Sequence, residues 1–128
     1  METTSQLLLA LRHHIGSGNY YHHPLNKKCY YTDGVRDLFQ RAKAFWLLDI
    51  FITELYEVAR YIEVGTYDME LEVFNNRTAQ LILHNYGNRN APLFIKELNF
   101  TDFPIGKIGF IVGNHGEGRV IICLPQED

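Results

Sequence analysis

The stretch GTYDMELEVFNNRTAQLILHN, residues 65–85, decides the fold because its apolar residues recur at every second position. Tyr67, Met69, Leu71 and Val73 alternate with acidic residues, and after an Asn-Asn-Arg turn the alternation resumes through Ala79, Leu81 and Leu83. A period of two is typical of a strand with one buried and one solvated face. The stretch therefore predicts an antiparallel β-hairpin.

The same stretch predicts a register. Val73 and Ala79 can lie opposite each other on the dry face only if the turn has an odd number of residues, so we expect a three-residue loop with an asparagine in the left-handed region. This register places Asp68 opposite His84 on the wet face. An exposed pair would contribute under about 1 kcal/mol, and it would matter as an acid–base pair only inside a cleft.

Other apolar runs bounded by turn residues predict further strands over residues 19–23, 29–32, 93–98, 108–112 and 120–124. The first two are separated by Pro24 and polar residues, which is typical of a short hairpin. The last two are joined by the glycine-rich residues 113–118, and we expect Val112 to face Val120 across that turn.

Two helices are expected. Thr3 and Gln6 form a capping-box pattern that begins an N-terminal helix ending at Gly16. Thr32 and Asp33 offer N-cap chemistry for a second, long helix whose apolar residues continue to Val58. The predicted fold class is α+β: one domain, residues 1–128, with an antiparallel sheet of about four to six strands, and with one long, mostly buried helix and the N-terminal helix packed on one face.

The composition limits the classes of partner. Of 128 residues, 46% are hydrophobic, which suffices for a folded core, and the formal net charge is −3. No basic stripe appears, so we do not expect nucleic acid to be a partner. The apolar run Leu7–Leu11 is too short to span a membrane and lacks a basic flank, which indicates a cytoplasmic protein without a membrane partner. Cys29 and Cys123 are then expected to be free thiols.

Familiar catalytic and metal-binding motifs are missing from the sequence. Adjacent histidines, as in His13-His14 and His22-His23, point apart on a helix or strand, and no CxxC or HExxH motif occurs. A metal site built from His22, Cys29 and His84 is conceivable, but the histidines are better explained by surface or packing roles. We expect no metal and no cofactor, and the residues indicate a protein that is not an enzyme.

The run YYHHPLNKKCYYTDGVRDL, residues 20–38, nevertheless concentrates reactive side chains. Cys29 lies close enough in sequence to the histidines for a hairpin to align a Cys–His pair, although no orienting third group is evident. Asp33 is explained most simply as helix-cap chemistry, and Asp49 interrupts a very apolar stretch. If these groups converge, they form the best candidate ligand or interaction site: Tyr21, His22, His23, Cys29, Asp33 and Asp49.

Four ordered motifs also carry a family resemblance: TDGV (32–35), WLLD (46–49), TDFP (101–104) and the closing LPQED (124–128). In these motifs the chain resembles an uncharacterised family of small bacterial proteins found in cyanobacteria and on mobile elements. The resemblance spans nearly the whole chain but departs from the family in the strand 67–74, where we would expect a tryptophan, and in the loop 113–118. It implies a compact domain in a bacterial or phage setting and no particular activity.

Two functional hypotheses follow. The first is a small, non-enzymatic accessory or interaction protein of bacterial, plasmid or phage origin, which binds an unknown protein partner or forms a homodimer along an exposed strand edge. The second is a small-molecule-binding or catalytic domain that uses the His/Tyr/Cys/Asp cluster of residues 20–49. A concave pocket lined by that cluster would favour the second hypothesis, and a flat apolar patch would favour the first.

Overall fold

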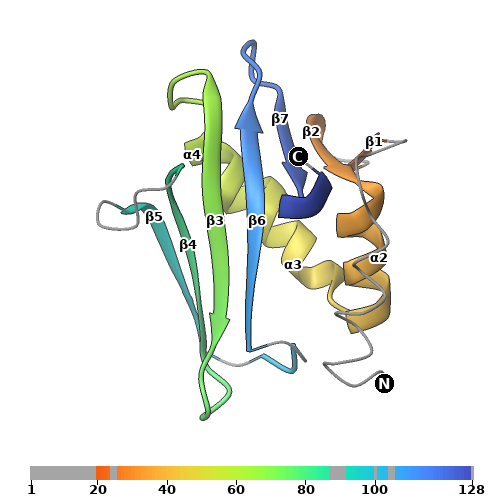
Figure 1. Cartoon of the computed structure of the whole chain (residues 1–128), viewed down its shortest axis with the longest axis vertical. Coiled ribbons are helices and arrows are strands. Elements are labelled where there is room, and N and C mark those ends of the chain that lie inside the picture. Colours follow the sequence, from red (N-terminus) through yellow and green to blue (C-terminus); the bar gives the residue numbers. More distant parts are fainter. Residues whose placement is uncertain (1–19, 24–25, 87–91, 100, 104–105, 128) are drawn as a thin grey trace.

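The computed structural model describes residues 20–23, 26–86, 92–99, 101–103 and 106–127. Within them, seven strands form one sheet in the order β1-β2-β7-β6-β3-β4-β5 (Figure 1). The strands are β1 (Tyr20–His23), β2 (Asn26–Thr32), β3 (Gly65–Val73), β4 (Ala79–Asn85), β5 (Pro92–Leu98), β6 (Lys107–Asn114) and β7 (Val120–Cys123). Neighbouring strands are antiparallel except β2 and β7, which are parallel.

The predicted antiparallel sheet of four to six strands is therefore wrong, because the sheet is mixed and has seven strands in the described residues. The error has a physical cause. Alternation along a strand shows which side chains face the core, and it does so equally well for either direction of the neighbouring strand. The partner of β2 comes from the far end of the chain, so no local turn indicates how the two strands pair.

The single long helix is also wrong. The helical region is divided into α2 (Asp33–Ala42), α3 (Phe45–Ile50), a π-helical turn η1 (Phe51–Leu55) and α4 (Tyr56–Ala59). α2 ends because Lys43 adopts a left-handed conformation with φ of 53°, and the next amide donates back to the carbonyl of Phe39. This ending usually uses glycine, so a lysine there leaves no signal in the sequence. The predicted N-terminal helix lies outside the described residues.

The helical segments cover one face of the sheet and build the core there (Figure 1). Its centre is a cluster of three phenylalanine rings: Phe51 lies 5.7 Å from Phe39 and 5.5 Å from Phe110, measured between ring centroids. Further fully buried side chains come from both layers: Val35, Leu38, Leu47, Leu55, Leu71, Leu81, Leu83, Val112, Val120 and Ile122. We call this side the covered face, and the opposite side the uncovered face.

The register predicted for the central hairpin is confirmed. Val73 lies opposite Ala79, and Asp68 lies opposite His84. Residues 75–77 form the three-residue loop, since the Phe74 amide donates to the Thr78 carbonyl at 2.8 Å. The residue in the left-handed region is Arg77, with φ of 67°, so the expected asparagine there is wrong.

The other strands agree with the sequence in position more than in register. The hairpin of β1 and β2 and the strand β5 are confirmed. In the hairpin of β6 and β7, Val112 lies opposite Ile122 and not Val120, a shift of two residues that keeps the same side chains on the covered face. The turn is tighter than expected because Gly116, Glu117 and Gly118 all have positive φ.

The short 3-10 helix η2 (Pro125–Glu127) follows β7. Among the described residues, no helix combines the length and the hydropathy that crossing a membrane requires.

Candidate functional site

The six residues predicted as a candidate site divide between the two faces of the sheet. In the pairing of β1 with β2, Tyr21 lies opposite Tyr31 and His22 lies opposite Tyr30. Directly opposed residues share a face, and Cys29 has the parity of Tyr31. Tyr21 and Cys29 therefore point to the covered face, whereas His22 points to the uncovered face.

Tyr21 and Asp33 are brought together, as the tyrosine hydroxyl donates to Asp33 Oδ1 at 2.7 Å. The guanidinium of Arg36 lies 4.5 Å from the centre of the Tyr21 ring, and the Tyr21 and Tyr31 rings are 5.8 Å apart. Burial raises the pKa of Tyr31, and the charge of Arg36 opposes that effect. These contacts attach the β1–β2 hairpin to the start of α2.

Cys29 is fully buried, and burial raises the pKa of its thiol from 9.0 to about 12. A thiol with this pKa is protonated at neutral pH, so it is a poor nucleophile and a poor metal ligand. Cys123 is also buried, and both cysteines are free thiols, as predicted.

Asp49 and His23 complete the predicted set. Asp49 is on the exposed side of α3, so its carboxylate reaches solvent despite the apolar residues around it in the sequence. His23 is the last residue of β1, and its side chain lies outside the described part of the chain. Within the described residues, no three His, Cys, Asp or Glu side chains are close enough to hold a metal ion.

The TDGV and LPQE segments meet in a buried contact that we call the clasp: Thr32, Gly34, Leu124 and Glu127. Glu127 accepts from the Thr32 hydroxyl at 2.6 Å, from the Gly34 amide at 3.0 Å and from the Leu124 amide at 2.9 Å. A Cβ at position 34 would overlap the Glu127 carboxylate, so a larger residue there would have to displace that side chain. The N-terminus of α2 is thus capped by the Glu127 carboxylate, and the predicted cap by the Thr32 side chain is wrong.

The TDFP segment has a similar structural role. The Arg77 side chain donates to the carbonyls of Thr101 and Phe103, each at 2.9 Å, and the Thr101 hydroxyl accepts from the Phe103 amide at 3.0 Å. Thr101 and Phe103 are buried. The contact joins the β3–β4 turn to the segment before β6, and it accounts for an arginine at the left-handed position of that turn.

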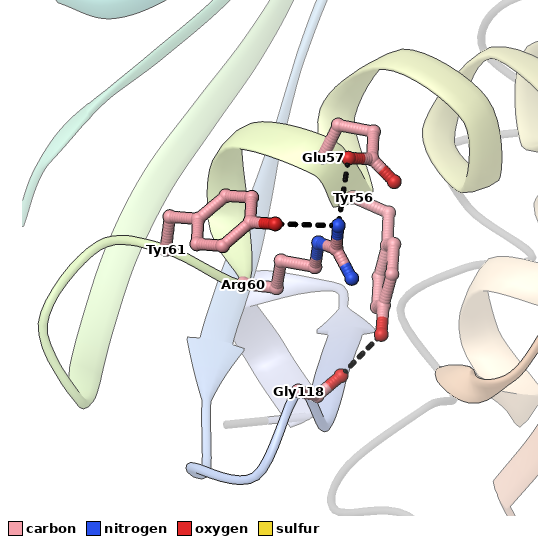
Figure 2. A network of polar contacts seen from close by, with 5 residues as sticks. All are labelled: Tyr56, Glu57, Arg60, Tyr61 and Gly118. Carbon is pink, nitrogen blue, oxygen red and sulfur yellow. Dashed lines mark hydrogen bonds and ion pairs between the residues drawn. The ribbon is translucent and has the colours of Figure 1, made fainter.

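A third polar cluster surrounds Arg60 at the end of α4 (Figure 2). Its guanidinium lies between two tyrosine rings, 4.5 Å from the centroid of Tyr61 and 5.7 Å from that of Tyr56, and it contacts Glu57 at 3.1 Å. The Tyr56 hydroxyl donates to the Gly118 carbonyl at 2.7 Å. The cluster therefore attaches the last helical turn to the β6–β7 hairpin, with the cation placed at a helix C-terminus.

Hollows lined by described residues lie on the uncovered face. One of about 340 Å³ is lined by Tyr20, Tyr30, His115, Arg119 and Ile121. The next, about 230 Å³, shares Tyr20, His115 and Ile121 with the first and extends to Ile111, Gly113, Cys123 and Glu127. These two hollows form one depression over β1, β2, β7 and β6.

The third hollow, of about 380 Å³, lies over β3, β4 and β6 and contains the predicted pair of Asp68 and His84. His84 is almost fully buried, and its Nδ1 lies 3.1 Å from the Asn85 carbonyl. Asp68 and His84 thus lie opposite each other in the lining of one open hollow.

The predicted six-residue set does not include Tyr20, Tyr30, His115 and Arg119, although both tyrosines lie in the run 20–38 that the sequence singled out. Their common signal is strand parity: Tyr20 and Tyr30 have the opposite parity to Tyr21 and Cys29 and so belong to the other face. The face of His115 and Arg119 can be assigned only from the correct register of the β6–β7 hairpin. The predicted register differs from the observed one by two residues.

Residues 5–128 match a family of unknown function (DUF6876). No curated protein and no solved structure matches the chain. Since the match spans almost the whole sequence, the chain belongs to the family of unknown function DUF6876.

Proposed function

We propose that this protein is a non-enzymatic interaction protein that pairs with a second copy of itself along the free edge of β5. The observation that carries the proposal is an apolar strip that ends at this edge. Ile95 lies directly opposite Ile82 of β4 on the uncovered face, and Ile95 is 49% exposed. A cytoplasmic setting in a bacterium, plasmid or phage is part of the same proposal, and its support is the short apolar run Leu7–Leu11 without a basic flank, together with the family resemblance.

The edge itself is suited to strand pairing. β5 is the last strand of the sheet order, so in the described residues it pairs on one side only, with β4. It spans seven residues, whereas β1 at the other end of the sheet spans four. A long strand with a free edge and exposed apolar side chains is a template for pairing with another strand.

The charges of β5 favour one register. In a two-fold antiparallel pairing, the residue on the axis faces its own copy. Lys96 on the axis would oppose two ammonium groups, which destabilises a strand pair. Ile95 on the axis brings two isoleucines together and extends the strip to Ile82-Ile95-Ile95-Ile82 across both copies. Lys96 then stays free to hold its ion pair with Glu54, 3.0 Å away on the helical side.

Sedimentation velocity of the full chain tests this proposal. We expect a species of about twice the chain mass of 14.9 kDa at micromolar concentrations. Ile95→Lys should return the protein to a monomer, because two ammonium groups would then meet at the axis. Val64→Lys is the matched control, since Val64 is 71% exposed but lies outside β5, and it should leave the dimer intact. A parent protein that stays monomeric at about 100 μM, or an unaffected Ile95→Lys variant, would refute the proposal.

A further inference from the structure

The depression over β1, β2, β7 and β6 is floored by a line of residues that crosses five strands. His22 lies opposite Tyr30, Tyr30 opposite Ile121, Ile121 opposite Gly113, and Gly113 opposite Thr66. All five positions therefore share the uncovered face. The line has a gap at Gly113, where no side chain rises from the sheet, and the depression lies over this gap.

The β6–β7 turn places two nitrogen-bearing side chains at the rim of the depression. The His115 amide donates to the Arg119 carbonyl at 2.9 Å, which makes the two residues the next opposed pair after Asn114 and Val120. Both side chains line the larger hollow. A Cβ on Gly113 would lie 2.9 Å from His115 Nε2, so a glycine there lets the imidazole fold over the sheet.

Two tyrosines form the opposite wall. Tyr20 is 57% exposed, and the Tyr30 ring is half-buried, with the His22 ring edge-on to it at 6.2 Å between centroids. Ile121 supplies the apolar floor between the tyrosines and the charged rim. Such a wall offers ring faces and hydroxyl groups to a flat ligand at a small cost in side-chain entropy.

The charge of the depression favours an anion. The described lining of the larger hollow contains Arg119 and no carboxylate. The nearest competitor is Glu117, whose carboxylate is 3.9 Å from the guanidinium and is itself 85% exposed, so that ion pair is weak. In the adjoining hollow, the Glu127 carboxylate is already satisfied by the three donors of the clasp.

From these observations we infer that the depression is a binding site for a small planar aromatic anion, a ring that carries a carboxylate or a phosphate. The ring lies against Tyr20, Tyr30 and Ile121, and the anionic group accepts hydrogen bonds from Arg119 and His115. Arginine suits this role because its planar fork can donate two hydrogen bonds to one carboxylate or phosphate. The inference does not depend on pairing through β5, which lies at the other end of the sheet.

Isothermal titration calorimetry of the full chain with two matched probes tests the inference. The anion 2-naphthoate and the cation 2-naphthylmethylammonium present the same ring with opposite charge. We expect the anion to bind at least about tenfold more tightly, because only it completes charge-assisted hydrogen bonds with the rim. Equal affinity for both probes would overturn the inference, as would the absence of naphthoate binding at millimolar concentrations.

Variants assign the effect to particular residues. Arg119→Gln should weaken naphthoate binding about tenfold and leave the cation almost unaffected, and Tyr30→Leu should weaken both probes. Arg41→Gln, an exposed arginine on α2, is the control and should change neither. Unchanged naphthoate binding by Arg119→Gln would overturn the site assignment. The Ile95→Lys variant should bind naphthoate as the parent does, which separates this test from that of the proposed dimer.

Discussion

The two faces of the sheet are built from the same alternating strands, but the helical segments cover only one of them. On the covered face, side chains such as Met69, Leu71 and Phe110 are sealed beneath the helical segments. On the uncovered face, the alternate positions carry Asp68, Glu70 and Ile111, together with glycines at 109 and 113, and the result is a row of hollows. Core packing thus accounts for the residue types on the covered face. The polar and glycine residues on the uncovered face need another explanation.

The largest expected effect comes from comparing a core residue on the covered face with an apolar residue on the uncovered face. Phe51→Ala should lower the free energy of unfolding by about 3–5 kcal/mol, since it empties the centre of the phenylalanine cluster. Ile121→Ala, on the uncovered face and half-exposed, should cost under about 1.5 kcal/mol. Urea denaturation of both variants measures the two losses of free energy of unfolding. Equal losses would show that the two faces contribute alike to stability.

The clasp is the next test, because Glu127 closes one part of the otherwise open face. Glu127→Ala should lower the free energy of unfolding by about 2–4 kcal/mol, because three buried hydrogen-bond donors would lose their acceptor. Glu63→Ala, which removes an exposed carboxylate, is the control and should stay within about 0.5 kcal/mol of the parent. A loss below about 1 kcal/mol in Glu127→Ala would mean that α2 does not rely on this cap.

A pH measurement probes the interior of the covered face. The pKa of Cys29 is raised from 9.0 to about 12 in the folded state, so its stabilising effect is complete below pH 9 and is lost as the pH rises toward 12. Between pH 9 and 10 this linkage should lower the free energy of unfolding of the parent by about 1 kcal/mol more than that of Cys29→Ala. Parallel curves for the two proteins over this interval would contradict a buried, protonated thiol. The tyrosines with raised pKa values titrate above this interval.

The smallest expected effect is at the margin of the covered face. Lys96 and Glu54 form an ion pair at 3.0 Å between β5 and the π-helical turn, and both side chains are more than a third exposed. Lys96→Met should therefore change the free energy of unfolding by less than about 1 kcal/mol, and 1 M salt should abolish the difference. A larger, salt-resistant loss would show that the pair is buried in solution.

The spacing of apolar residues along the chain predicts the features of the fold that depend only on residues close in sequence. The alternation in residues 65–85 was enough for the hairpin, its register and the opposition of Asp68 and His84. It could not show that β2 lies parallel to β7, because parallel and antiparallel partners require the same alternation. The end of α2 at Lys43 was missed because a lysine replaces the glycine that usually marks such an ending.

The candidate site was harder to predict because it depends on the face to which each residue turns. The run 20–38 is rich in reactive side chains, and the predicted site grouped Tyr21, His22 and Cys29 because they are close in sequence. Closeness in sequence does not place these side chains on the same face of the sheet. Adjacent strand residues point to opposite faces. Tyr20 and Tyr30 therefore line the depression on the uncovered face, whereas Cys29 is buried in the core. The motif residues Thr32, Gly34 and Glu127 have a structural explanation in the clasp that no spacing along the chain could reveal.

The claim that the depression on the uncovered face is a binding site is tested most directly by mapping amide chemical shifts by NMR while 2-naphthoate is added. The changes should concentrate on Tyr20, Tyr30, Gly113, His115 and Ile121 and should be small along α2, α3 and α4. Shift changes centred on the helical segments, or none at saturating naphthoate, would contradict it.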